Sequence, residues 1–373
     1  MKSAIWVVGL VMFLSLSGTG QAQDLPPCAE RPTHQDPPWV SLDWCLEVVI
    51  KDGQAGELAF SALAVGPDGT LYATRPNTGE ILALTDTDGD ALPDSPQVIA
   101  DGLTLPNGLV WHDGALYISG GARLDRWRDN QLVTLVDDLP SGSGFWTGRL
   151  TIGPDERLYV GSGAPCDWCE QTAPGRAAIW SYALDGSDPQ VIATGIREPM
   201  DVAFLGGYLW SVDTAPDQTT EVEGDRLLQI EQGAFYGWPT CLVQRENSDC
   251  SSIPPAALTF PTHSHPVGLE AYTATTFPSI QNHLLVVLNG SRGTAALEGY
   301  TLVAVPIQAD GKASDYRIIV PESATAEFAV PLLRMHYVKS GFWPLRPLDV
   351  AVSPEGWIYV SVSGGSIYAL RPR

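Results

Sequence analysis

The sequence predicts an all-β protein, a six-bladed β-propeller that forms a single domain. Three observations lead to this fold class: a repeated hairpin pattern, a composition rich in turn residues, and little helical periodicity. The chain has 373 residues, and its 37 Gly, 30 Pro and 12 Trp are typical of short strands joined by tight loops. Apolar residues rarely recur at the i, i+3, i+4, i+7 spacing of an amphipathic helix, so folds that alternate helices and strands are disfavoured.

The repeated unit is a short apolar segment, a turn with Asp-Gly or its equivalent, and then an apolar-aromatic strand. Each copy predicts a two-strand hairpin, because apolar residues alternate on both sides of the turn. Clear copies cover residues 63–74, 109–119, 150–161, 202–212 and 350–361, and a weaker sixth copy covers residues 277–288.

A further strand follows most of these hairpins, as expected for the outer part of a propeller blade. These strands cover residues 79–84, 122–127, 177–182, 225–230, 300–305 and 366–371. The N-terminal strand at residues 45–50 is available to pair with the last blade and close the ring. Long connections in propellers gather at one end of the ring, so the longer spacing after residue 239 places a functional site there.

The first residues have the pattern of an export signal. Lys2 precedes an apolar stretch at residues 5–16, and the small residues Gly20 and Ala22 suit cleavage after residue 22. The apolar stretch is shorter than the roughly 20 residues of a membrane-spanning helix. The predicted domains are a signal peptide at residues 1–22, an N-terminal extension at 23–44 and the propeller at 45–373. A secreted or periplasmic location follows.

The charge of the chain limits its partners. The formal net charge is −22 at pH 7, which disfavours binding to nucleic acid and to anionic membranes. The sequence also lacks a Gly-x-Ser-x-Gly elbow, a phosphate-binding loop and an H-E-x-x-H motif, so the commonest hydrolases and nucleotide-binding proteins are disfavoured.

An even number of cysteines in an exported protein predicts disulfides. Proximity in the sequence favours the pairs Cys28–Cys45, Cys166–Cys169 and Cys241–Cys250, although spacing alone does not determine connectivity. The motif C-D-W-C at residues 166–169 leaves a redox or metal-binding role as the alternative to a structural disulfide.

An acidic turn at residues 85–94, TDTDGDALPD, is a candidate calcium loop. Asp86, Asp88 and Asp90 alternate along it, and alternating carboxylates can converge on one hard cation. Ala91 stands where an EF-hand has its Gly, so a solvated acidic hairpin tip is the alternative. The close pair His263 and His265 has no third metal ligand nearby, which favours an ordinary loop.

Several segments occur together in a fixed order: GFWTGRLTIGPDERLYVGSG (144–163), GIREPMDVAF (195–204), LWSVDTAP (209–216), YGWPTC (236–241) and RPLDVAVSPEGWIYVS (346–361). Over roughly residues 45–371 the chain resembles soluble pyrroloquinoline quinone (PQQ)-dependent glucose and sorbosone dehydrogenases, which are six-bladed propellers. The resemblance implies oxidation of an aldose or aldehyde by hydride transfer to the quinone. A histidine base, a calcium ion and basic residues that hold the quinone carboxylates are implied with it. The electron acceptor is not indicated.

The resemblance assigns roles to several positions. Arg197 would lie beside the quinone and stabilise negative charge on it, and Arg346 would pair with one of its carboxylates. Ala215 and Pro216 would offer their backbone carbonyls to calcium. Glu198 stands near the quinone in place of an amide.

Other positions depart from the family pattern. Phe145 stands where the family has its catalytic histidine, and a phenyl ring cannot accept a proton. The base is then expected elsewhere, for example at Glu198 or His265, in a PQQ-dependent sugar or aldehyde dehydrogenase. The alternatives are a catalytically degenerate propeller that binds a ligand or partner, and a calcium-dependent hydrolase. Further departures are Leu348 for an arginine, Asn289 for a histidine and Arg226 for a glutamate.

Overall fold

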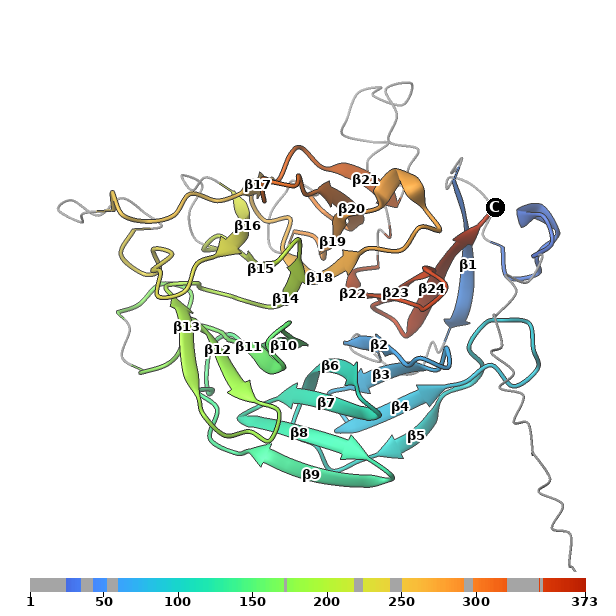
Figure 1. The fold of residues 1–373 in the computed structure, drawn as a ribbon, viewed down its shortest axis with the longest axis horizontal. Coiled ribbons are helices and arrows are strands. Elements are labelled where there is room, and N and C mark those ends of the chain that lie inside the picture. Colours follow the sequence, from blue (N-terminus) through green and yellow to red (C-terminus); the bar gives the residue numbers. More distant parts are fainter. Residues whose placement is uncertain are drawn as a thin grey trace, which may run out of the picture.

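The computed structural model of the chain is a ring of six four-stranded antiparallel sheets, arranged as the blades of a propeller (Figure 1). It describes residues 25–34, 43–51, 60–170, 173–217, 224–241, 250–291, 298–320, 342 and 345–373. The fold class predicted from the sequence is confirmed. The predicted signal peptide at residues 1–22 lies outside the described residues. Within the described ranges, no helix has the length and apolar character needed to cross a membrane.

Each of the first five blades is formed by four consecutive strands. They are β2–β5 (Leu63–Val65, Leu71–Arg75, Glu80–Leu84, Gln97–Ala100), β6–β9 (Pro106–His112, Ala115–Gly120, Arg123–Arg128, Gln131–Val136), β10–β13 (Thr147–Ile152, Arg157–Ser162, Ala178–Ala183, Gln190–Thr194), β14–β17 (Val202–Leu205, Tyr208–Asp213, Asp225–Ile230, Leu258–Phe260) and β18–β21 (Pro266–Tyr272, His283–Leu288, Thr301–Pro306, Arg317–Val320). Two short 3₁₀ turns are η1 (Cys28–Glu30) and η2 (Pro278–Ile280).

The sixth blade joins the two ends of the described chain. Its inner strands are β22 (Pro347–Val352), β23 (Ile358–Val362) and β24 (Ser366–Pro372), and its outer strand is β1 (Trp44–Lys51). β1 runs antiparallel to β24, from Trp44 opposite Pro372 to Lys51 opposite Ser366. The prediction that residues 45–50 close the ring with the last blade is confirmed.

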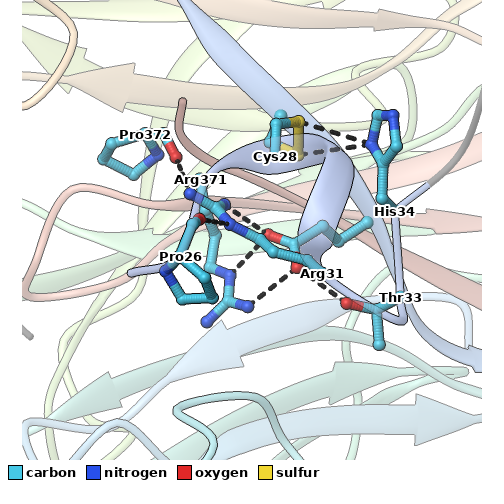
Figure 2. Close-up of a disulfide and its surroundings, with 9 residues drawn as sticks. Pro26, Cys28, Arg31, Thr33, His34, Arg371 and Pro372 are labelled. Atoms are coloured by element: carbon cyan, nitrogen blue, oxygen red, sulfur yellow. Dashed lines mark hydrogen bonds and ion pairs between the residues drawn. A yellow bond between two sulfur atoms is a disulfide. The ribbon is translucent and has the colours of Figure 1, made fainter. Parts of the chain in front are cut away.

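A buried ion cluster holds this closure together. Glu47 of β1 accepts hydrogen bonds from Arg371 Nε (2.7 Å) and Nη2 (2.8 Å). Arg31 Nη1 donates to the same carboxylate at 2.9 Å, and the Thr33 hydroxyl donates at 2.7 Å. Figure 2 shows Arg31 and Arg371 side by side, with Arg31 also reaching the carbonyl oxygen of Pro372 at 2.6 Å. Burial by itself raises the pKa of Glu47, but the hydrogen bonds of Arg371 and Thr33 and the charge of Arg371 hold it below its ordinary value.

The described structure contains the disulfides Cys28–Cys45, Cys166–Cys169 and Cys241–Cys250. They are the pairs that proximity in the sequence favours, so the disulfide prediction is confirmed. The first of them joins η1 to β1 beside the ion cluster, with His34 Nδ1 at 3.3 Å from each sulfur (Figure 2).

The predicted sixth hairpin is only half correct. The inner strand of this blade is β18, and it pairs with β19. Residues 277–282 belong to the connection between them, which covers residues 273–282 and includes η2. Pro278 starts η2 and has no N–H to donate to a sheet, and Asn282 has a φ of 59°, in the left-handed region. Only the second half of the predicted 277–288 hairpin is therefore a strand, β19.

The hydrophobic core lies between neighbouring blades. Ile179 of β12 and Leu209 of β15 belong to one buried cluster, and Val212 of β15 and Leu269 of β18 belong to the next. Both faces of a blade are thus covered, which explains why the strands contain such regular apolar positions.

The loops that precede the first strand of each blade open on one end of the ring. The start of each first strand pairs with the end of the second strand, as in Thr147 opposite Ser162 and Pro266 opposite Leu288. Loops that enter first strands and leave second strands therefore lie together. We call this end of the ring the entry face. The acidic loop at residues 85–94 lies at the other end, because it follows Leu84, which pairs with Leu71 at the start of β3.

Candidate functional site

Phe145 lies on the entry face, just before β10, in a tightly held loop. Its N–H donates to the carbonyl oxygen of Ala164 at 2.9 Å. The buried guanidinium of Arg176 donates to the carbonyl oxygens of Phe145 (2.9 Å) and Ala164 (3.0 Å). A Cβ atom at Gly163 would lie 2.5 Å from the Cβ of Phe145, so this close approach requires glycine. These contacts fix the position of the phenyl ring.

Arg197 is the buried centre of the site. Its guanidinium carbon lies 4.1 Å from the centroid of the Phe145 ring, which covers one face. Asp167 Oδ1 accepts hydrogen bonds from Arg197 Nε (2.9 Å) and from Nη2. Nη1 donates to the Thr214 hydroxyl at 2.6 Å and lies 3.4 Å from Glu198 Oε2. The structure therefore brings together Phe145, Arg197 and Glu198, as the resemblance predicts.

Glu198 and His265 form a pair beside Arg197. Glu198 Oε2 lies 3.5 Å from His265 Nε2 and accepts a hydrogen bond from the Thr214 hydroxyl. Burial raises the pKa of Glu198, but His265, Arg197 and Thr214 together lower it to about 2. Glu198 is thus ionised at neutral pH and is a poor proton acceptor. It can orient His265, whose side chain is 23% exposed and whose φ of 57° is a strained backbone conformation.

A small cavity of about 20 Å³ adjoins this pair and is lined by Thr214, Ala215, Asp217, Asp225, His263 and His265. Asp225 is buried and accepts hydrogen bonds from the backbone N–H groups of Ala215 (2.8 Å) and His265 (2.6 Å). Burial raises the pKa of Asp225, which is the response of a carboxylate that lacks a full counter-charge. The volume suits one water-sized particle, and oxygen donors suit a hard cation. The cavity therefore fits a calcium ion close to Ala215, whereas Pro216 is not among its lining residues.

The described residues fit a quinone less directly than they fit a calcium ion. Arg346, before β22, donates to the carbonyl oxygens of Gly290 (2.6 Å) and Ser291 (2.8 Å) and to the Tyr300 hydroxyl (3.0 Å). The guanidinium groups of Arg197 and Arg346 are thus both bound by the protein itself. A quinone oxygen or carboxylate would have to displace Asp167 to bind Arg197 at Nε.

Three positions that depart from the family pattern have structural partners. Arg226 is paired with Asp213 Oδ2 and donates to the carbonyl oxygen of Tyr236 at 3.1 Å. Asn289 Nδ2 donates to the carbonyl oxygen of Pro347 at 2.9 Å. Leu348 is buried in β22. In this structure these three side chains make structural contacts or are buried at the entry face.

The acidic loop is separate from this site. The carboxylates of Asp86, Asp88 and Asp94 lie within 4.8 Å of one another. The side chain of Asp90 instead accepts the backbone N–H of Leu92 at 2.8 Å. The structure therefore groups Asp86 and Asp88 with Asp94, at the end of the ring opposite Arg197.

Sequence reasoning missed Asp167, Thr214 and Asp225. A signal for Asp167 is present in the sequence, since an acidic residue inside C-D-W-C is held by a four-residue disulfide ring. Thr214 follows one predicted strand of the fourth blade and Asp225 begins another, and the sequence does not indicate which other residues they contact.

A second buried charge cluster joins the inner strands, and sequence reasoning also missed it. Arg149 of β10 donates to the carbonyl oxygens of Ser61 and Leu348, each at 2.9 Å, and to that of Val267. Its Nε lies 3.2 Å from Asp349 Oδ1. One arginine thereby links the third blade to the first, fifth and sixth across the ring.

Glu270 of β18 lies near this cluster and predicts a pH dependence of stability. Burial and the charge of Asp349 raise the pKa of Glu270 to about 8, although the Ala271 N–H opposes this. The folded protein therefore keeps a proton that the unfolded chain releases, so this group destabilises the fold as the pH rises from about 4.5 to about 8. Glu270→Gln is expected to raise the free energy of unfolding by about 1–3 kcal/mol at pH 8 and by much less at pH 5. Urea unfolding at both pH values measures this, and an equal change at the two would contradict it.

Comparison with known proteins bears on the resemblance. The chain matches no family model. Over 250 residues it is 24% identical to quinoprotein glucose dehydrogenase B of Acinetobacter calcoaceticus, a match that covers 50% of this chain and 51% of that protein. The chain thus spans about half the length of this curated relative.

Solved structures share the fold over nearly the whole chain. The holo form of the pyranose dehydrogenase PQQ domain from Coprinopsis cinerea has a TM-score of 0.69 at 16% identity, and the match covers 91% of this chain and 99% of that one. The calcium structure of a Trichoderma reesei protein of Carbohydrate-Active Enzymes family AA12 has a TM-score of 0.70 at 17% identity, with 92% and 100% covered. At these identities the structural likeness establishes the shared fold. Together with the curated relative, it confirms the resemblance seen in the sequence: this chain is a six-bladed propeller similar to quinoprotein sugar dehydrogenases.

Proposed function

We propose that this protein is an oxidoreductase that oxidises a sugar or a related aldehyde, with PQQ and calcium bound at the entry face. The names of its relatives, a quinoprotein glucose dehydrogenase and the PQQ domain of a pyranose dehydrogenase, support this chemistry. The observation that carries the proposal is the His265–Glu198 pair beside Arg197. It supplies a proton acceptor in a site where Phe145 cannot be one.

The proposed mechanism assigns the proton to His265. When bound, PQQ would accept a hydride from the substrate carbon. Glu198 faces Nε2 of His265, so Nδ1 is the nitrogen that accepts the proton of the substrate hydroxyl. The ionised Glu198 then stabilises the imidazolium, and Arg197 stabilises negative charge that develops nearby. The contact of 3.5 Å is longer than a normal hydrogen bond, and such contacts commonly shorten when substrate binds.

The remaining residues hold and shield the site. Ala215 and Pro216 would bind calcium through their carbonyl oxygens, with Asp225 supplying a buried negative charge beside them. Phe145 covers one face of Arg197 and keeps water from it. Its role in this proposal is to shield the guanidinium, since a phenyl ring cannot accept the proton.

We also propose that the protein is exported, with residues 1–22 as its signal peptide, 23–44 as an extension and 45–373 as the propeller. Disulfides persist in oxidising compartments, and the three disulfides of this chain support a secreted or periplasmic location.

A second candidate function is a propeller that binds a quinone or sugar without turnover. The observation that favours it is that Asp167, Thr214 and Glu198 already hold Arg197, which leaves its guanidinium less available to stabilise charge that develops during turnover. The two candidates share the location of the site and differ in whether His265 moves a proton.

Loading the purified protein with PQQ and calcium is expected to give micromolar quinone binding and substrate-dependent dye reduction. Quenching of tryptophan fluorescence measures the binding, and a panel of aldoses and aldehydes measures the activity. A calcium chelator is expected to abolish the dye reduction. Binding without turnover would favour the second candidate, and a lack of binding at micromolar quinone would refute both quinone-based proposals.

A further inference from the structure

The disulfide Cys166–Cys169 closes a four-residue ring on the entry face, with Cα atoms 6.0 Å apart. Both cysteines and Phe145 pack against a small buried cluster of Ala164, Ala177 and Trp238. The indole N–H of Trp238 donates to the carbonyl oxygen of Asp167, inside the ring, at 3.1 Å. Two constraints, one covalent and one from a hydrogen bond, therefore fix the backbone of Asp167.

The carboxylate of Asp167 is bound unevenly. Its Oδ1 accepts hydrogen bonds from Arg197 Nε (2.9 Å), from Arg197 Nη2 and from the backbone N–H of Asp217 (3.1 Å). Its Oδ2 is buried and accepts no hydrogen bond from the described residues. Burying an oxygen that has no donor costs free energy. The contacts of Oδ1 with Arg197 and the constraint from the disulfide ring must offset this cost to keep the side chain in place.

Most N–H groups of Arg197 are already bound by neighbouring residues in this arrangement. Nε and Nη2 face Asp167, and Nη1 faces Thr214 and Glu198. Asp217 Oδ1 lies a further 3.7 Å from Nη2. Three carboxylates thus surround one guanidinium, and an incoming anion meets net negative charge and a guanidinium whose Nε and Nη1 donors are already taken.

We propose that Asp167 is an internal competitor for Arg197, which occupies the position that an anionic ligand group would take, and that the Cys166–Cys169 ring keeps it there. A carboxylate fixed next to its partner acts at a high effective concentration, so a ligand that displaces it binds more weakly. The identification of the ligand as the quinone rests on the proposed function. The competition of Asp167 for Arg197 is independent of that proposed function.

The first test measures quinone affinity. Asp167→Asn is expected to tighten PQQ binding about tenfold, because it removes one negative charge and weakens the competing contact. The double variant Cys166→Ser/Cys169→Ser is also expected to tighten PQQ binding, because Asp167 is then no longer held by the disulfide ring. The matched controls are Asp188→Asn, which breaks an Arg–Asp pair with Arg157 at the other end of the ring, and Cys241→Ser/Cys250→Ser, which removes another disulfide. Both controls are expected to leave the affinity unchanged.

The second test needs no quinone. Phenylglyoxal labels accessible arginines, and peptide mass spectrometry reports the labelling of Arg197, which is fully buried in this structure. Labelling is expected to be low in the parent protein and in both controls, and to rise severalfold in Asp167→Asn and in the Cys166/Cys169 variant. Circular dichroism measures whether each variant is folded. If the cysteine variant is unfolded, the labelling of Asp167→Asn alone tests the competition.

The outcomes separate the two proposals. Increased labelling of Arg197 with no PQQ binding by any variant would overturn the proposed function and support the competition. Unchanged labelling in a folded Asp167→Asn variant would overturn the competition. Quinone binding that is equally tight in Asp167→Asn and in the parent protein would overturn it as well.

Discussion

Replacing His265 with alanine is expected to lower substrate-dependent dye reduction by the loaded protein by about 100- to 10,000-fold, the usual contribution of a general base. In the proposed mechanism the imidazole takes the substrate proton, and the phenyl ring of Phe145 cannot replace it. Steady-state kinetics with dye and substrate measure the change in kcat.

A matched pair elsewhere in the chain provides the control. His112 Nε2 lies 2.9 Å from Glu156 Oε2, so it is also a histidine–glutamate pair, but it lies at the end of the ring opposite the entry face. His112→Ala is expected to leave kcat unchanged. Equal kcat values for His265→Ala and the parent protein would show that another group, or no group, accepts the proton.

A rescue variant provides a second test of the assignment of His265 as the base. Phe145→His places an imidazole at the family's base position, 4.1 Å from the guanidinium carbon when measured to the present ring centroid. In the His265→Ala background it is expected to restore part of the lost turnover, because a base is then available beside Arg197 again.

Replacing Glu47 with glutamine is expected to lower the free energy of unfolding by about 3–5 kcal/mol at pH 7, as typically follows when one partner of a buried ion pair is removed. Glu47 is fully buried and is the carboxylate shared by Arg31 and Arg371. Without its charge, two buried guanidinium groups face each other at the joint that closes the ring. Urea unfolding followed by circular dichroism measures the loss.

The pH dependence and a control make this prediction specific. The pKa of Glu47 is lower in the folded state than its ordinary value of 4.5, so its stabilisation is present above that value and disappears as the pH falls through the folded pKa. The difference between Glu47→Gln and the parent protein is therefore expected to shrink in acid. Glu80→Gln breaks a partly exposed pair with Arg75 and is expected to cost about 0–1 kcal/mol. A similar loss for both variants would show that burial of the cluster is unimportant.

Much of the fold could be predicted because its signals are local. The Asp-Gly turns and the alternating apolar positions at residues 63–74 or 150–161 specify hairpins within about a dozen residues. Closure by residues 45–50 followed from counting strands. The one hairpin that was wrong in part, at residues 277–288, has a proline at Pro278 that prevents sheet pairing and moves the inner strand to β18.

The candidate site could be predicted only in part because its contacts join distant segments. The sequence placed Arg197, Glu198, Ala215 and Pro216 near one another through the family resemblance. It did not indicate that Asp167, 30 residues before Arg197, binds the guanidinium. Arg149 was missed for the same reason, since its partners Ser61 and Leu348 lie 88 and 199 residues away.

By itself, the sequence determined the propeller fold, the closure of its ring, the disulfide pairs favoured by proximity and the replacement of the family's histidine by Phe145. Turn chemistry and strand periodicity act within a few residues, so they can be recognised without the rest of the fold. Only the tertiary structure decided that Phe145 covers Arg197, that Glu198 faces His265 and that Asp167 occupies the guanidinium. These side chains come from loops of different blades, and they meet because the ring brings the start of each blade to one face.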